Sequence, residues 1–169
     1  LKLTPDEDLR PGFTDPIQLT SKSALDGGIW VDFTDKNPRH FRMGVYPDKA
    51  IWNPENKRMP DIPEEQKPWI TYEYPPFSRD HWTHICMTIE GFNNEDKNAV
   101  GKLYVDGKLH GELSGFQQTY TWDPALAQIR LGVNFRGSMD ELSCFDRALN
   151  PDEILELYQL VGGVSSLLD

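Results

Sequence analysis

The stretch GKLYVDGKLHGEL, residues 101–113, is the clearest structural signal in this sequence. It predicts two strands joined at Asp106-Gly107, because an Asp-Gly pair suits a tight turn with positive φ angles. Further strand-like segments lie on both sides of it: HWTHICMTIEG (81–91), AQIRLGVN (127–134) and GSMDELSCF (137–145). Short strands separated by turn signals are typical of an all-β sandwich or barrel.

The region before these segments predicts three more strands and one long loop. The strands are DPIQLTSK (15–22), IWVDFTD (29–35) and RHFRMGVY (39–46), the last with strict apolar alternation. Residues 47–69 contain five prolines and follow neither the strand nor the helix period. We therefore expect a long loop there, and such loops in compact domains are often functional.

One helix is predicted near the end of the sequence. Asn150 suits an N-cap, Pro151 suits the first turn, and Glu153 completes a capping-box pattern. Apolar residues then recur at helical spacing up to Val161, where a pair of glycines ends the run.

Composition excludes some classes of function. At 169 residues the chain has the size of one domain, and its net charge of −10 argues against a nucleic-acid binder, which needs a basic stripe. No apolar run reaches the roughly 18 residues of a membrane span, and no signal peptide is visible. The acidity is compatible with attracting Ca²⁺, although solubility alone also explains it. Because the sequence starts at Leu1, we expect a fragment or a processed form.

In order and spacing, residues 81–160 resemble the laminin-G-like (concanavalin A-like) jelly-roll modules. The resemblance rests on a Trp-led strand, the LYVDG hairpin, the strand AQIRLGVN and the closing segment FRGSMDELSCFDRALNPDEILELY. Residues 13–46 fit the early strands of that family loosely, and residues 1–3 resemble the tail of one of its opening strands.

This resemblance implies two packed antiparallel sheets in a jelly-roll sandwich with one short C-terminal helix. The domain would cover residues 1–161, with opening strands missing or replaced, and 162–169 would be a tail or linker. It further implies a non-catalytic binding module of a larger extracytoplasmic protein, located extracellularly, at the cell surface or in the periplasm. The expected ligand is a carbohydrate, with neighbouring domains as further partners. A protein-binding or structural module, and a glycoside hydrolase or polysaccharide lyase, stay open as alternatives, because one scaffold carries all of these.

Asp140 and Glu141 are adjacent acids in a predicted strand. Glycosidase carboxyls must share one surface, whereas neighbouring residues in a strand point to opposite faces, so this pair is not catalytic. No other acids have a better spacing, and we predict no catalytic residues. Asp140 shares its face with Leu142 and Cys144, which we expect to be the core side, so it needs a partner there. The resemblance favours a structural Ca²⁺ at Asp140, with a hydrogen-bonded Asp and no metal as the alternative. Glu141 is expected to pair with Arg147 or Arg136.

Aromatic side chains are the best candidates for glycan binding, because their flat faces can stack on sugar rings. The long loop supplies Trp52 and Trp69, Tyr72 follows it, and Trp122 lies after the hairpin. We expect these four to bind ligand, with core packing as the alternative for each. Trp30, Trp82 and Phe135 are instead expected in the core.

The sequence contains two cysteines, Cys86 and Cys144, in apolar strand-like segments. We expect both to act as small buried hydrophobes. A disulfide between them stays open, because buried strand positions seldom meet the required Cα spacing.

Overall fold

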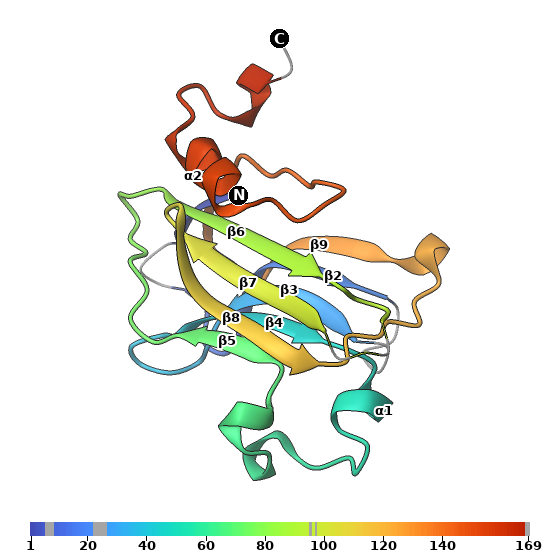
Figure 1. Ribbon diagram of the computed structural model, residues 1–169. Helices are drawn as coiled ribbons and strands as arrows, with labels where there is room; N and C mark the ends of the chain where they lie inside the picture. The colour runs from blue at the N-terminus through green and yellow to red at the C-terminus, as the bar shows by residue number, and fades with distance from the viewer. Residues whose placement is uncertain (6–8, 22–26, 95, 97, 168–169) are drawn as a thin grey trace.

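The computed structural model describes residues 1–5, 9–21, 27–94, 96 and 98–167. Within these residues ten strands form two antiparallel sheets of five strands each, which pack face to face (Figure 1). The expected all-β sandwich is thus confirmed. The predicted strand 15–22 ends at Lys22, which lies outside the described residues, as do the last two residues of the expected tail.

We call the two sheets sheet I and sheet II. Sheet I has the order β10-β1-β6-β7-β8, with β1 Lys2–Pro5, β6 Thr83–Glu90, β7 Ala99–Val105, β8 Lys108–Phe116 and β10 Gly137–Asp140. Sheet II has the order β5-β4-β3-β2-β9, with β2 Thr14–Thr20, β3 Gly28–Phe33, β4 Phe41–Tyr46, β5 Trp69–Tyr72 and β9 Gln128–Val133.

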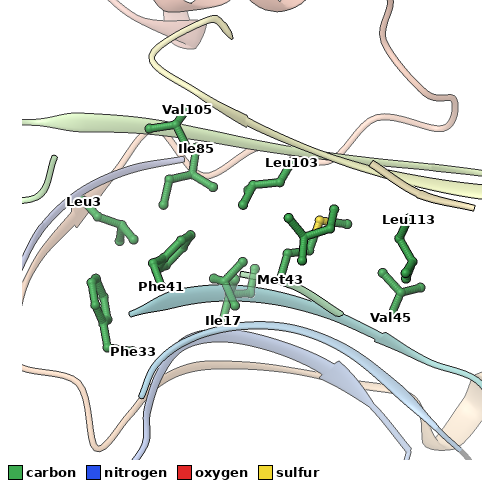
Figure 2. Close-up of a cluster of buried hydrophobic side chains, with 12 residues drawn as sticks. Leu3, Ile17, Phe33, Phe41, Met43, Val45, Ile85, Leu103, Val105 and Leu113 are labelled. Atoms are coloured by element: carbon green, nitrogen blue, oxygen red, sulfur yellow. The ribbon is translucent and has the colours of Figure 1, made fainter. Parts of the chain in front are cut away.

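The core lies between the sheets and follows the two-residue period of the strands. Phe41, Met43 and Val45 alternate inward along β4, as the sequence predicts, and all three are almost fully buried. Facing them across the core are Leu3, Ile85, Leu103 and Val105 of sheet I (Figure 2). Burial of this apolar surface is the main stabilising contribution to the sandwich.

The predicted hairpin joins β7 to β8. Asp106 has φ 49° and Gly107 has φ 73°, so both turn residues are left-handed, as the Asp-Gly pair predicts.

The predicted helix is α2, Pro151–Gln159. Its capping box is complete: the Asn150 side chain accepts from the N–H groups of Asp152 and Glu153, and the Glu153 carboxylate accepts from the Asn150 N–H. Ile154 is fully buried against Tyr104 and Leu149, which fixes α2 on the outer side of sheet I.

The predicted long loop 47–69 is only partly irregular. It contains a short helix, α1 (Lys49–Trp52), and two 3-10 turns, η2 (Met59–Asp61) and η3 (Glu64–Gln66), and its last residue begins β5. The prediction missed these elements because a one-turn helix and an edge strand are too short to show a period.

The predicted strand 137–145 is wrong beyond Asp140. Strand β10 ends at the pair Lys2↔Asp140, which is also the end of its ladder with β1, and Glu141 turns the chain with φ 56°. The inward face of β10 carries Met139, which packs against the core, whereas Asp140 is exposed. The expectation that Asp140 points to the core is therefore wrong.

Glu141 was expected to pair with Arg147 or Arg136, and of these Arg147 pairs with another acid. Arg147 donates two hydrogen bonds to Glu153, at 2.8 and 2.6 Å, and the Glu141 carboxylate accepts from the backbone N–H of Val164. The side chain of Glu141 thus tethers the segment that follows α2 to the end of β10.

The cysteines differ in their surroundings. Both are free thiols, Cys86 half-buried and Cys144 exposed, so the expectation of a buried Cys144 is wrong. Burial raises the pKa of the Cys86 thiol above its ordinary value.

No helix among the described residues is long and apolar enough to cross a membrane.

Candidate functional site

The outer face of sheet II, turned away from the core, carries aromatic and charged side chains. Because inward residues alternate along β4, Arg42, Gly44 and Tyr46 point outward. The strand register places Gly44 between Trp30 of β3 and Trp69 of β5. Strands β2 and β3 bow toward the core in Figure 2, so this outer face is concave.

Gly44 allows the indole of Trp30 to lie across the sheet. A Cβ atom at Gly44 would lie 2.2 Å from two ring carbons of Trp30, far inside contact distance. The absence of a side chain at Gly44 therefore sets the orientation of this ring.

Four rings form what we call the aromatic cluster: Trp30, Tyr46, Trp52 and Trp69. Tyr46 stacks on Trp52 with ring centroids 4.8 Å apart, and it meets Trp30 edge-on at 5.4 Å. The ring centroid of Trp69 lies 6.1 Å from that of Tyr46 and 6.5 Å from that of Trp30. All four rings are half-buried, and each keeps part of its surface open to solvent.

Arg42 is held at the edge of the aromatic cluster. Its guanidinium carbon lies 4.3 Å from the ring centre of Trp69 and 5.1 Å from that of Trp30, which is cation–π distance. Its Nε and Nη2 groups donate to the two carboxylate oxygens of Asp32, at 3.0 and 2.5 Å. Burial pushes the pKa of Asp32 up, and the hydrogen bonds from Arg42 oppose this.

Trp69 has a second polar contact at its other end. Its Nε1–H donates to Glu64 Oε1 at 2.5 Å, and Lys67 Nζ donates to Glu64 Oε2 at 2.8 Å. Burial works against ionisation of Glu64, but these two hydrogen bonds outweigh it and hold its pKa below its ordinary value. The Trp69 ring is thus fixed on one side by Arg42 and on the other by Glu64.

Asp15 lies on the same face, on β2. Burial raises its pKa to about 6, a hydrogen bond from the Gln18 amide opposes the rise, and the charge of Asp32 adds to it. Asp15 and Asp32 are thus two neighbouring carboxyls whose pKa values are both raised by burial.

The structure brings together only some of the predicted ligand residues. Trp52 and Trp69 are both members of the aromatic cluster. Tyr72 points to the other face of sheet II, where it packs against the core. There its ring stacks on that of His110, with the ring centroids 3.7 Å apart. The ring centroids of Trp122 and Tyr120 are 4.9 Å apart. Thr121, between them in the sequence, donates its backbone N–H to the Asp48 carboxylate.

Several residues of the site were not predicted, among them Trp30, Arg42 and Tyr46. Trp30 was expected in the core, and this is wrong, because it points outward while Val31 faces the core. The alternation of the segment IWVDF contained the signal, since it places Trp30 on the same face as Asp32. Trp82 is likewise exposed, whereas Phe135 packs against the core as expected.

Asp140, the residue expected to hold calcium, lies at the end of β10. The side chain of Asp140 is exposed and accepts the N–H of Glu141 at 2.8 Å. Within the ranges described above, no group of three or more His, Cys, Asp and Glu side chains lies close enough to hold a metal. The side-chain donors that calcium prefers are therefore not assembled there, and calcium at Asp140 stays a prediction.

Three comparisons place the chain among known proteins. Residues 20–155 match a laminin G family model of the concanavalin A-like lectin/glucanases superfamily. No curated protein matches the sequence. A solved structure, a domain of an S-layer domain-containing protein from Clostridium thermocellum, aligns with 16% identity and a TM-score of 0.33. That alignment covers 88% of this chain and 64% of the other.

Proposed function

The chain belongs to the concanavalin A-like lectin/glucanase superfamily, and from this premise we propose that it is a non-catalytic module that binds a carbohydrate at the aromatic cluster. We further propose that it works outside the cytoplasm, as one domain of a larger protein.

The observation that carries the proposal is the row formed by Trp30, Gly44 and Trp69 on a concave face. Ligand sites combine a mainly apolar surface with a few fixed polar groups. Here two indoles supply flat apolar surface, and Arg42, Asp15 and Gln18 supply donors and acceptors beside it. A sugar ring, which has apolar C–H faces and a polar rim, matches this combination.

The state of the carboxyls supports binding without catalysis. A glycosidase needs two carboxyl groups free to exchange protons or to attack, on one surface. Asp15 and Asp32 are two acids that share this face. Arg42 donates hydrogen bonds to both carboxylate oxygens of Asp32, and the side chain of Asp32 is only 5% exposed. Asp32 therefore positions Arg42, and of these two acids Asp15 is the one left to act on a ligand.

The test is a glycan array followed by calorimetric titration of the best hit. We expect Trp69→Ala to weaken binding at least about tenfold, as truncation of an aromatic anchor does. Trp69→Phe should retain most of the affinity, because it keeps an aromatic ring at this position while it loses part of the indole surface and the hydrogen bond to Glu64.

The matched control is Trp82→Ala, which removes an indole that is 44% exposed and lies outside the aromatic cluster. It should leave glycan affinity unchanged. An array without hits, or equal affinities for Trp69→Ala and the unchanged protein, would overturn the proposal. In that case the same face would suit contact with a neighbouring domain.

A further inference from the structure

Strand β2 carries two polar side chains, Asp15 and Gln18, on the outer face of sheet II. Gln18 lies opposite Trp30 of β3, so it is a direct neighbour of the aromatic cluster. A register shift between Thr14 and Ile17 turns Asp15 to the same face. There the Gln18 amide donates a hydrogen bond to Asp15 Oδ2. The two side chains thus form a polar pair beside one of the indoles.

The hydrogen bonds of this pair leave several of its polar groups open to a ligand. Asp15 is half-buried, and within the described parts of the chain the Gln18 amide is the one hydrogen-bond donor to its carboxyl. A carboxylate that is partly removed from water needs donors, and Oδ1 receives none from these residues. The Gln18 amide uses one N–H on Asp15 and keeps its second N–H and its carbonyl oxygen.

The nearby arginine of β4 is committed to the other acid. Arg42 donates to both carboxylate oxygens of Asp32, and its guanidinium carbon lies 5.1 Å from the ring centre of Phe13 and equally far from that of Trp30. Enclosed in this way, the Arg42 side chain is only 12% exposed. It is therefore held on Asp32 and does not form an ion pair with Asp15.

The charged side chains that face this pair from the neighbouring strands β3, β4 and β9 are Asp32, Arg42 and Arg130. Opposite Asp15 itself, β9 carries the uncharged Val133. Arg130 donates two hydrogen bonds to the side-chain oxygen of Gln128, at 3.3 and 3.1 Å. Both cations are thus bound to other acceptors, so ionised Asp15 keeps a negative charge that no cation of these strands neutralises.

We propose that ionised Asp15 and Gln18 bind two adjacent hydroxyl groups of a neutral sugar that lies against Trp30. This inference rests on the proposed function and specifies the ligand of the same site. One ligand hydroxyl donates to Asp15 Oδ1, and its neighbour accepts the remaining N–H of Gln18, because a hydroxyl group can do either. A ligand carboxylate at this place would be repelled by Asp15, so the site selects neutral sugars against uronic acids.

The ionisation of Asp15 sets the pH range in which the sugar binds. Burial raises the pKa of Asp15 to about 6, and the hydrogen bond from Gln18 opposes this rise. Apparent affinity is proportional to the fraction of the protein in the binding-competent state. Between pH 7 and pH 5 the ionised fraction of Asp15 falls from about nine-tenths to about one-tenth, so affinity should fall about tenfold.

The test is calorimetric titration of the protein with matched pairs of oligosaccharides at pH 7 and pH 5. Each pair is a cello-, manno- or galacto-oligosaccharide and the same chain oxidised to the uronate at C6. We expect neutral chains to bind about tenfold more weakly at pH 5, and uronates to bind more weakly than their neutral partners at pH 7. At pH 6 each bound neutral chain should release about half a proton, measured in buffers of different ionisation enthalpy.

Three variants assign the pH dependence to Asp15. Asp15→Asn should bind roughly tenfold more weakly at pH 7 and with the same affinity at pH 5, because it keeps the shape and loses the charge. Gln18→Met should weaken binding and move the midpoint of the pH profile to higher pH, because the Gln18 hydrogen bond lowers the pKa of Asp15. The matched Glu156→Gln removes an exposed carboxylate on α2 and should change neither affinity nor profile. Circular dichroism at both pH values verifies that each variant is folded.

The inference is overturned if neutral chains bind equally at pH 7 and pH 5, or if a uronate binds more tightly than its neutral partner. A pH dependence that persists in Asp15→Asn also overturns it, since another group such as Asp32 would then titrate. These results leave the proposed function intact as long as Trp69→Ala weakens binding. If no neutral chain binds at pH 7 the inference fails, and the proposed function fails with it only if the glycan array gives no hit.

Discussion

At the scale of single residues, Gly44 determines the geometry of the proposed ligand face. It is flanked on the neighbouring strands by Trp30 and Trp69, and the Trp30 indole occupies the space that a Cβ atom would need. This requirement cannot be predicted from the sequence around Gly44, because it comes from a residue on another strand.

Gly44→Ala is expected to destabilise the fold by about 1–3 kcal/mol, because the added methyl group must displace the Trp30 ring. Urea denaturation followed by tryptophan fluorescence measures both the loss and the altered ring environment. Gly28→Ala on β3 is the matched control, since its Cβ would meet the nearest atom at an ordinary 3.4 Å. If both variants unfold at the same urea concentration, the proposed role of Gly44 is wrong.

At the scale of secondary structure elements, α2 shows how local signals set a boundary. The helix begins where Asn150 satisfies two N–H groups, and Ile154 then anchors it to sheet I through Tyr104 and Leu149. Capping and packing thus act on successive turns of one short helix.

Asn150→Ala is expected to cost about 1 kcal/mol of unfolding free energy, because the N–H groups of Asp152 and Glu153 lose their acceptor. Amide exchange at these two positions should become faster, and chemical denaturation gives the free energy. Glu156→Ala, an exposed substitution within the same helix, should change stability by no more than about 0.5 kcal/mol. Equal losses in both variants would argue against the cap.

The elements that the sequence predicts best are those encoded by neighbouring residues. The β7–β8 turn and the start of α2 depend on Asp106-Gly107 and on Asn150 with Glu153, and both are confirmed. The end of β10 was mispredicted because it depends on a distant partner: the ladder with β1 stops at Lys2↔Asp140, and the apolar residues after it stay outside the sheet.

The same distinction applies to the candidate site. Trp52 and Trp69 could be chosen from their place in a proline-rich region, but Tyr46, which lies between them, belongs to a strand that the sequence marks only as core-forming. Tyr72 lies three residues after Trp69 on β5, so the strand period sends it to the opposite face. That consequence depends on knowing that β5 is a strand.

At the scale of the whole molecule, each sheet carries a titratable group whose pKa burial shifts to a value between about 4 and 6. On sheet II the pKa of Asp15 is raised to about 6, and on sheet I the pKa of His84 is lowered to about 4. Burial disfavours the protonated form of His84, and the positive charges of the N-terminal amine and Lys2 add to this effect. Among the described residues its Nδ1 has no hydrogen-bond partner.

These two groups are expected to affect stability in opposite directions between pH 4 and 6. Folded Asp15 keeps its proton in this range and the unfolded chain loses it, so its contribution falls as the pH rises. For His84 the unfolded chain binds the proton, so its contribution rises with pH.

Asp15→Asn removes a group that stabilises the folded protein at low pH. Between pH 6.5 and 4 the unfolding free energy of this variant should therefore fall by about 1 kcal/mol more than that of the unchanged protein, after allowance for solvent screening. His84→Gln should do the reverse. Urea denaturation at several pH values measures both slopes. Parallel pH profiles for the two variants would show that neither group titrates as stated.

The pairing of β1 with β10 has a mechanical consequence. The ladder begins at Lys2↔Asp140 and ends at Pro5↔Gly137, so a pull between Leu1 and α2 arrives at one end of it. Once the Ile154 contact has yielded, the hydrogen bonds of this ladder would break one pair after another, not all at once. Under tension the molecule should therefore lengthen first by unzipping β10 from β1, while the strands around the hairpin keep the core packed between the sheets.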